Sequence, residues 1–112
     1  MELLFKICPA AEWREAARTG HYGGSAADRA DGFIHLSAAG QVRETAARHF
    51  AGMDGLALVA FPADLDRLKW EPSRGGALFP HVYGRLPVDR ALWVKPLPLV
   101  DGRHVFPPEV PA

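Results

Sequence analysis

The sequence is short of several features that usually identify a class of protein. Cys8 is the only cysteine among 112 residues, which excludes an intrachain disulfide and is compatible with a reducing compartment. No apolar run approaches the roughly 20 residues that a membrane-spanning helix needs, and the first residues lack the basic and apolar regions of a secretory signal. We therefore expect a cytoplasmic protein that has no membrane partner.

An excess of one charge is absent too. The 13 Lys and Arg residues balance 13 Asp and Glu residues, and the basic residues are scattered along the chain, so we expect no nucleic-acid partner. The chain also lacks the glycine-rich phosphate loops, the paired-cysteine motif and the nucleophile elbow of common enzyme families. No metal site is expected, because the usual ligand spacings are missing among the histidines, which are His21, His35, His49, His81 and His104.

The chain does have the composition of one globular domain, with 48% hydrophobic and 23% charged residues. We expect a single domain that spans residues 1–112. Two helices are predicted from apolar residues at helical spacing, at 10–18 and within 38–50. Five or six strands are predicted from apolar runs and alternation, including 2–8, 56–61, 68–71, 78–86 and 91–94.

Both predicted helices lie in the first half of the chain. This order predicts an α+β fold in which the helices pack on a mostly antiparallel sheet. The loop at 72–78 contains two adjacent glycines, which cost conformational entropy to order, so we expect it to be mobile. The proline-rich tail after Val94 is expected to be extended chain on the surface.

The stretch from Asp31 to Ser37 is the first candidate for a site. An Asp-Gly turn is followed by a short apolar strand that contains His35, and Ser37 stands where the N-cap of the following helix is expected. This arrangement would hold His35 and Ser37 beside a helix N-terminus, a position that favours anions. The preceding segment 21–30 contains two glycines and is expected to be either a surface turn or a ligand-covering loop that carries Tyr22.

A second candidate stretch lies in the late strand that contains His81. Residues i and i+2 of a strand point to the same face, so His81 pairs with Tyr83 as His35 pairs with Ser37. We expect these four side chains to line one cleft. Glu71 is expected at the edge of that cleft, where its carboxylate would orient a histidine ring.

Several motifs of the chain resemble those of one bacterial family, the Domain-of-Unknown-Function 952 family. The resemblance covers nearly the whole chain and rests on Trp13, Tyr22, Asp31–Ser37 with Gln41, Leu68–Glu71 and Phe79–Gly84. It implies a fold similar to that of ADP-ribosyltransferases, in which a split β-structure clamps NAD.

The resemblance also implies roles for individual residues. The strand with His35 and Ser37 is similar to the histidine-plus-hydroxyl strand with which those enzymes hold nicotinamide and its ribose. Those enzymes usually carry a catalytic carboxylate on a late strand, where this chain has His81 and Tyr83, whereas Glu71 lies on an earlier element. The candidate catalytic residues are Glu71 and His81, and the candidate ligand-binding residues are Tyr22, His35, Ser37, Gln41 and Tyr83.

Three functions are compatible with these expectations. The first is a cleft that binds a nucleotide-like small molecule, with NAD as the candidate cofactor or substrate, and that catalyses transfer or hydrolysis at the ribose C1′. The second is a non-catalytic binding or regulatory module that keeps the cleft without turnover. The third is a structural domain in which the histidines are core groups.

Overall fold

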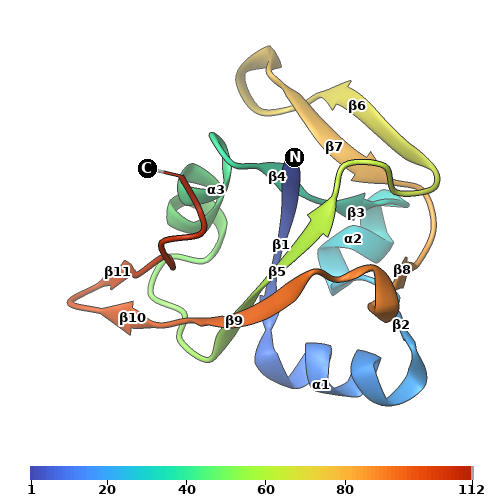
Figure 1. The fold of residues 1–112 in the computed structure, drawn as a ribbon. Helices are drawn as coiled ribbons and strands as arrows, with labels where there is room; N and C mark the ends of the chain where they lie inside the picture. Colours follow the sequence, from blue (N-terminus) through green and yellow to red (C-terminus); the bar gives the residue numbers. More distant parts are fainter. Residues whose placement is uncertain (112) are drawn as a thin grey trace.

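The computed structural model describes residues 1–111, and its centre is a four-stranded antiparallel sheet (Figure 1). The strand order is β4-β1-β5-β9, made of β4 (Ser37–Ala38), β1 (Leu3–Pro9), β5 (Leu56–Pro62) and β9 (Trp93–Leu97). Strand β5 pairs with β1 from Leu3↔Pro62 to Pro9↔Leu56 and with β9 on its other side. The predicted strand at 56–61 is therefore confirmed, at the centre of this sheet.

A second antiparallel sheet has the order β3-β7-β6, made of β3 (Ile34–His35), β7 (Leu78–Val82) and β6 (Leu68–Pro72). The chain crosses between the two sheets at Leu36. The Leu36 N–H donates to the Pro80 carbonyl at 3.0 Å, and the next residue, Ser37, already pairs with Phe5 of β1. Residues 34–38 therefore join the two sheets.

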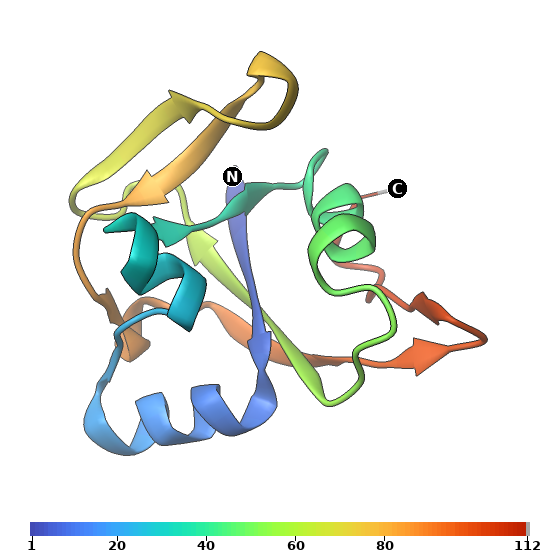
Figure 2. The same ribbon diagram turned by 180° about the vertical axis from the view of Figure 1, so that it is seen from behind.

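Two shorter antiparallel pairs complete the strands of the described chain. Strand β2 (His21–Tyr22) pairs with β8 (Leu86–Pro87), and β10 (Leu99–Val100) pairs with β11 (Arg103–His104). Figure 2 shows the β6–β7 hairpin at the opposite end of the molecule from the first helix. The predicted strand at 78–86 is thus divided, because β7 ends at Val82 and a bend follows it.

Residues 1–111 contain three α-helices, all in the first half of the chain: α1 (Ala10–Thr19), α2 (Ala26–Asp31) and α3 (Val42–His49). Two 3-10 turns, η1 (Arg74–Gly76) and η2 (Val88–Arg90), follow later. The α+β class and the helices at α1 and α3 are confirmed. The expected number of two helices is wrong, because the segment predicted to be a loop contains α2.

Helix α2 forms because both of its ends are capped. The Ser25 hydroxyl accepts from the Asp28 N–H at 3.1 Å, and the Asp28 carboxylate accepts from the Ser25 N–H at 3.0 Å, which is a capping box. Gly32 ends the helix with a left-handed φ of 86°, a conformation that glycine adopts at low cost. The Asp31-Gly32 pair is therefore a helix end rather than an isolated turn.

The prediction that Ser37 caps the third helix is also wrong. A turn closed by the Gln41 N–H and the Ala38 carbonyl, at 2.9 Å, follows Ser37, and α3 begins only at Val42. Ser37 instead lies in β4, and its hydroxyl oxygen is 2.9 Å from the hydroxyl oxygen of Thr45 on α3. The serine contacts the helix from the side, so it does not satisfy the helix N-terminus.

Both faces of the four-stranded sheet are covered. Alternate residues of β1 and β5 pack on α1 on one face, in a cluster that includes Leu4, Cys8, Trp13, Ala16, Val59 and Phe61. On the other face they pack on α3, in a cluster that includes Phe5, Ile7, Val42, Ala46, Leu58 and Ala60. This arrangement explains why β5 is apolar at every position instead of alternating with polar residues.

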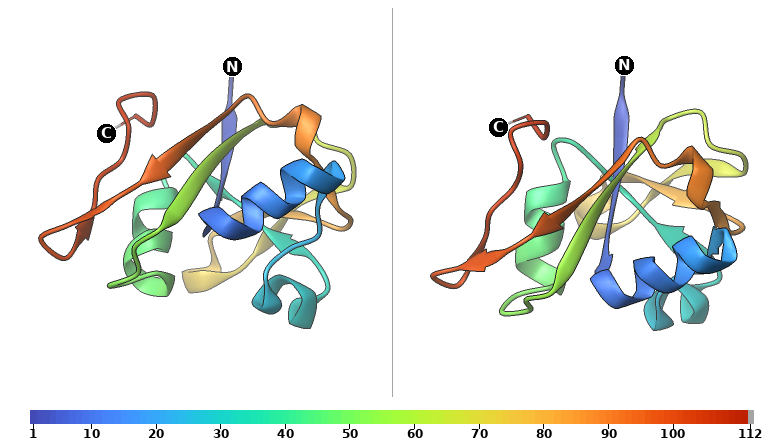
Figure 3. Two further views of the ribbon diagram at one scale, coloured as in Figure 1. Left: turned by 90° about the horizontal axis from the view of Figure 1, so that it is seen from below. Right: turned by 60° about the horizontal axis from the view of Figure 1, so that its bottom comes forward.

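The C-terminal tail is more structured than its prolines predict. Pro96 lies within β9, which tolerates it because an edge strand has a row of backbone groups without a partner. Figure 3 shows the last residues returning past α3. There Val110 is 2% exposed, and the Arg43 guanidinium donates to the carbonyls of Val110 and Pro111. No helix within residues 1–111 has the length and apolar character needed to cross a bilayer.

Candidate functional site

The candidate site is a cleft of about 530 Å³ between the four-stranded sheet, helices α2 and α3, and the β6–β7 hairpin. It exists because β4 is short. Strand β4 pairs with β1 only at Leu4 and Phe5, so the next residues of β1 form a wall of the cleft. The volume lies in the range of small-molecule sites. Much of the lining is apolar, including Phe5, Ile7, Leu36, Phe50, Met53 and Phe79.

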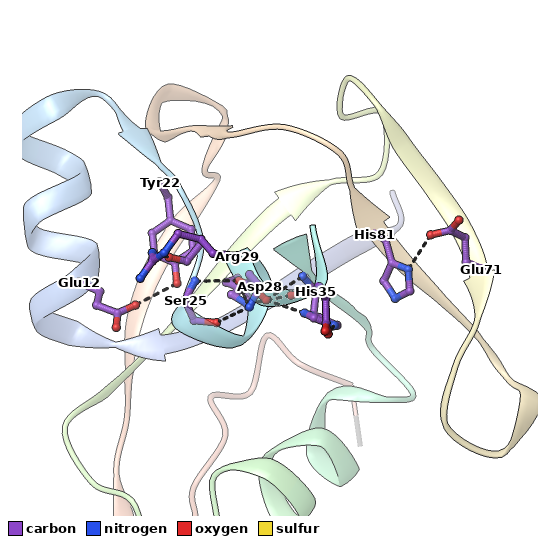
Figure 4. A network of polar contacts seen from close by, with 11 residues as sticks. Glu12, Tyr22, Ser25, Asp28, Arg29, His35, Glu71 and His81 are labelled. Atoms are coloured by element: carbon purple, nitrogen blue, oxygen red, sulfur yellow. Dashed lines mark hydrogen bonds and ion pairs between the residues drawn. The ribbon is translucent and has the colours of Figure 1, made fainter. Parts of the chain in front are cut away.

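A buried carboxylate, Asp28, organises one side of the cleft (Figure 4). Asp28 is 2% exposed. Its Oδ2 accepts from Lys6 Nζ at 2.8 Å, and its Oδ1 lies 2.6 Å from Nδ1 of His35. The backbone N–H groups of Ser25 and His35 also donate to it, at 3.0 and 3.2 Å. The carboxylate therefore joins β1, α2 and β3.

The charges of this network fix the orientation of His35. Burial opposes ionisation of Asp28, but the hydrogen bond from His35 and the Lys6 ammonium together hold the pKa of this carboxyl well below its ordinary value of 3.8. Because Asp28 is ionised, Nδ1 of His35 carries the proton between them. Lys6 also donates to the His35 carbonyl at 3.0 Å. The other ring nitrogen, Nε2, lies 2.9 Å from the half-exposed carboxylate of Asp31.

A second carboxylate–imidazole pair comes from the β6–β7 hairpin. Nδ1 of His81 lies 2.8 Å from Oε1 of Glu71, and the Tyr83 hydroxyl donates to the same oxygen at 2.7 Å. The hydrogen bonds from His81 and Tyr83 lower the pKa of the Glu71 carboxyl, and the bond to Glu71 raises the pKa of the Tyr83 hydroxyl. His81 is 4% exposed and lines the cleft.

The two pairs meet at Phe33. Its ring stacks on His81 with centroids 4.1 Å apart, and it also contacts His35 at 4.7 Å and Tyr83 at 5.3 Å. His35 and His81 are direct partners in the β3–β7 register, with ring centroids 5.5 Å apart. Figure 4 shows the two imidazoles lying between their carboxylate partners. Histidines oriented in this way are suited to acid–base chemistry and to hydrogen bonding with a ligand.

The structure brings together His35, Ser37 and His81 at the cleft: His35 and His81 are cross-strand partners in β3 and β7, and Ser37 lies on β4. Glu71 and Tyr83 do not line the cleft themselves but are attached to it through His81. The prediction that four side chains line one cleft is therefore corrected at Tyr83, because β7 ends at Val82 and the Tyr83 hydroxyl is bonded to Glu71 outside the cleft. Glu71 lies next to the cleft, in contact with His81. The roles of the five residues in binding or catalysis stay predictions.

Gln41 holds the backbone beside the cleft. Its side-chain oxygen accepts from the Ala38 N–H at 3.0 Å, and its side-chain nitrogen donates to the Leu78 carbonyl at 2.7 Å. Both ends of the amide are therefore occupied by backbone groups, and Gln41 is not part of the cleft wall. The geometry gives it a positioning role between the β4–α3 connection and β7.

Tyr22 lies apart from the other predicted ligand-binding residues. It is 3% exposed on β2, its ring contacts Trp13 with centroids 5.9 Å apart, and its hydroxyl donates to Glu12 at 3.1 Å. Burial raises the pKa of this hydroxyl above its ordinary value. Neither expected alternative for 21–30, a surface turn or a ligand-covering loop, describes this segment, because it contains β2 and most of α2 and Tyr22 belongs to the core.

Three residues of the site escaped the sequence reasoning: Lys6, Asp28 and Phe33. Two of them left a signal. Lys6 is the one charged residue in the apolar segment from Leu3 to Ile7, a position that predicts a buried partner. Asp28 stands three residues after Ser25, the spacing of a capping box. Within residues 1–111, no group of three or more His, Cys, Asp or Glu residues is arranged to hold a metal ion.

Solved structures of a protein from Caulobacter crescentus are similar to this chain. The crystal structure of that protein, CC0527, is 48% identical, matches 92% of this chain and 93% of that chain, and superposes with a TM-score of 0.88. The solution NMR structure of CC0527 gives 46% identity over 91% of this chain and 90% of that one, with a TM-score of 0.81. A comparison with curated proteins finds no significant match.

The family assignment agrees with the motifs in the cleft. The model of the family described as "Protein of unknown function (DUF952)" matches residues 7–94, which is more than half of the chain. The matched region contains both carboxylate–imidazole pairs and Phe33 between them. The chain therefore belongs to the DUF952 family.

Proposed function

We propose that the cleft binds a nucleotide-like ligand, with NAD or an ADP-ribosyl group as the candidates. One observation carries this proposal: His35 and His81, each held through Nδ1 by a carboxylate, lie 5.5 Å apart at the wall of a 530 Å³ cleft with a largely apolar lining. The apolar surface suits a base or a nicotinamide ring, and the polar groups suit a ribose. Ser37 adds a hydroxyl to the same wall.

The choice of NAD rests on a proposed kinship with the ADP-ribosyltransferase fold. Two antiparallel sheets that join at Leu36 beside a cleft support this kinship. The residues that cross the junction include His35 and Ser37, the pair that resembles the nicotinamide-ribose strand of those enzymes. In this proposal His35, Ser37 and His81 contact the ligand, Tyr83 acts on the site through its hydrogen bond to Glu71, and Tyr22 and Gln41 support the surrounding structure.

The catalytic form of the proposal is transfer or hydrolysis at the ribose C1′. In hydrolysis the bond between C1′ and the nicotinamide nitrogen breaks, and a water oxygen bonds to C1′ and gives up a proton. His81 lines the cleft and faces the positive charge that develops on the ribose, and Glu71, 2.8 Å from Nδ1 of His81, adds its negative charge from behind the imidazole. Lowering of the Glu71 pKa by His81 and Tyr83 keeps this carboxyl negative at neutral pH.

A specific observation favours the alternative of a binding or regulatory module without turnover. Oε1 of Glu71 already accepts from Tyr83 and lies in hydrogen-bond contact with His81. These contacts spread the negative charge over neighbouring groups and so weaken its attraction for a charged ribose. A cleft that binds but does not cleave the ligand is compatible with this arrangement.

Ligand titration and a turnover assay test the proposal in turn. NAD and ADP-ribose at millimolar concentration should raise the melting temperature of the parent protein, because they bind the folded state. His35→Gln and His81→Gln should reduce this shift, whereas His21→Gln, at an exposed histidine on β2 outside the cleft, should not. Absence of binding by both compounds at millimolar concentration overturns the proposal.

Release of nicotinamide from NAD, followed by chromatography, separates the two forms of the proposal. In the catalytic form, Glu71→Gln abolishes nicotinamide release while NAD still binds. In the non-catalytic form, the parent protein binds NAD and releases no nicotinamide above the buffer rate.

A further inference from the structure

Arg74 lies at the rim of the cleft, on the turn η1 that joins β6 to β7. Its guanidinium lies over the ring of Phe79, 4.8 Å from the centroid, and its side chain is 18% exposed. Phe79 precedes His81 by two residues on β7, so the two rings point to the same face, about 7 Å apart along the strand. The guanidinium therefore lies within reach of a ligand that also contacts His81.

The polar contacts of Arg74 leave donors unused. Nη2 is buried, yet it makes no hydrogen bond with any group in residues 1–111. Oε2 of Glu44 lies 3.3 Å from it, which makes an ion pair, but the angles are not those of a hydrogen bond. Nη1 reaches Nε2 of His49 only at 3.4 Å. A buried donor without an acceptor is rare in native proteins, so this one requires an explanation.

We propose that Arg74 binds a phosphoryl group of the ligand, the diphosphate in the case of NAD or ADP-ribose. The inference rests on the proposed nucleotide site and adds the position of its anion. A guanidinium presents its N–H groups as a planar fork that matches two oxygens of a phosphate. The other cationic side chain of the cleft, Lys6, is already paired with Asp28 at 2.8 Å, so Arg74 is the cation with donors to offer.

Glu44 acts as a displaceable partner in this assignment. It is 58% exposed on α3 and also lies 3.7 Å from Arg48, so it keeps a positive neighbour and water when it leaves Arg74. A phosphoryl group that takes its place gains charge-assisted hydrogen bonds to Nη2. Glu44 therefore competes with the ligand anion, and its removal should favour binding.

Two variants at one ion pair distinguish an anion site from a structural tie between the hairpin and α3. Arg74→Gln and Glu44→Gln both break the pair, but only the first removes the guanidinium. ADP-ribose, inorganic diphosphate and adenosine are titrated calorimetrically into the parent and both variants, and urea melts confirm that the variants fold. Adenosine contains the base and sugar without the anion.

Arg74→Gln should weaken ADP-ribose and diphosphate binding about tenfold to hundredfold, the usual range for a lost hydrogen bond to a charged group. It should leave adenosine binding within about twofold of the parent. Glu44→Gln should bind ADP-ribose as well as the parent or more tightly. Equal weakening by both variants, or an unchanged preference for ADP-ribose over adenosine in Arg74→Gln, overturns the assignment.

The same titrations separate failure of this inference from failure of the proposed function. Diphosphate binding that depends on Arg74, together with no binding of ADP-ribose or NAD, removes the nucleotide proposal and keeps the anion site. ADP-ribose binding with the same affinity in Arg74→Gln as in the parent rules out the anion site at Arg74 and leaves the nucleotide proposal standing. Absence of binding by diphosphate and by both nucleotides removes both.

Discussion

The buried carboxylate of Asp28 offers the most direct test of how the cleft is built. Its two oxygens accept from Lys6, from two backbone N–H groups and from the His35 ring. Asp28→Asn keeps the size of the side chain but replaces one accepting oxygen with an amide that donates. Lys6, which is 5% exposed, then faces a neutral group and has lost its negative partner.

The expected cost is large for a single substitution. Removal of one member of a buried ion pair usually destabilises a protein by about 3–5 kcal/mol. A domain of this size loses roughly 4 °C of melting temperature per kcal/mol, so the midpoint should fall by about 12–20 °C. Asp31→Asn is the matched control. Its carboxylate contacts the other nitrogen of His35 but is 54% exposed, so the cost should stay within about 1 kcal/mol.

Urea denaturation followed by tryptophan fluorescence measures both variants. A double-mutant cycle adds Lys6→Met, because removal of both charges leaves no uncompensated ion in the core. The double variant with Lys6→Met and Asp28→Asn should therefore lose less stability than the sum of the two single variants. Equal costs for Asp28→Asn and Asp31→Asn, or strict additivity in the cycle, would show that the network does not carry the energy assigned to it.

The pH dependence of the difference in unfolding free energy between the parent and Asp28→Asn gives an independent check. The Asp28 carboxyl is more acidic in the folded state than its ordinary pKa of 3.8. Its stabilisation is therefore fully present above about pH 4 and is lost as the pH falls through the folded-state value. The gap in unfolding free energy between the parent and Asp28→Asn should be constant from pH 7 to 5 and shrink below pH 4. A gap that widens on acidification contradicts the sign of the shift.

Four further predictions concern other parts of the chain. Burial raises the pKa of the Cys8 thiol to about 11, so iodoacetamide at pH 8 should alkylate it slowly in buffer and rapidly in urea; equal rates would contradict its burial. Phe61→Ala, at a side chain with no exposed area, should lower the free energy of unfolding in urea melts by about 3–5 kcal/mol. A loss below about 1 kcal/mol would contradict the packing. Tyr83→Phe should raise the pKa of Glu71, measured by carboxyl ¹³C NMR, because one donor to the charged form is lost. Amides of the loop at 72–78 should show fast-timescale motion in ¹⁵N relaxation, and order parameters equal to those of β5 would count against its expected mobility.

Short sequence patterns predicted the helices and strands whose apolar residues follow a regular spacing over a few residues. The apolar run at 56–61 identified β5, because a strand covered on both faces has no polar side to alternate with. The same type of reasoning missed α2. The glycines at 23 and 24 indicated a turn, and the capping pair of Ser25 and Asp28 directly after them was overlooked.

The set of residues that meet at the site depends on which strands are neighbours, and short sequence patterns carry no information on that. Alternation along each strand grouped His35 with Ser37 and His81 with Tyr83. It could not show that β3 and β7 are neighbours, which is what places His35 directly opposite His81. The capping-box spacing could have identified Asp28 as a helix cap, but its contact with His35 joins α2 to β3 and could not be inferred without the tertiary fold.

The tail shows a different limit. The tail was expected to be extended chain on the surface, but no strand was predicted after Val94, although a proline costs a strand little when its missing N–H faces an unpaired edge. Pro96 occupies such a position in β9, which has β5 on one side only. The apolar character of Val110 was the better guide, because a buried anchor decides where a tail lies even when its backbone is irregular.

The β6–β7 hairpin indicates why these polar groups are kept together. No residue of β6 is fully buried, and Trp70 at its centre is 39% exposed, so this strand adds little to the core. It pairs with β7 along its whole length, and its Glu71 side chain bonds to His81 and Tyr83. A buried ion pair such as that of Lys6 and Asp28 also contributes little net stability compared with apolar packing. Both carboxylates hold a histidine at Nδ1, and Asp28 in addition caps α2 and pairs with Lys6, so orientation of the histidines is a contribution that the two carboxylates share.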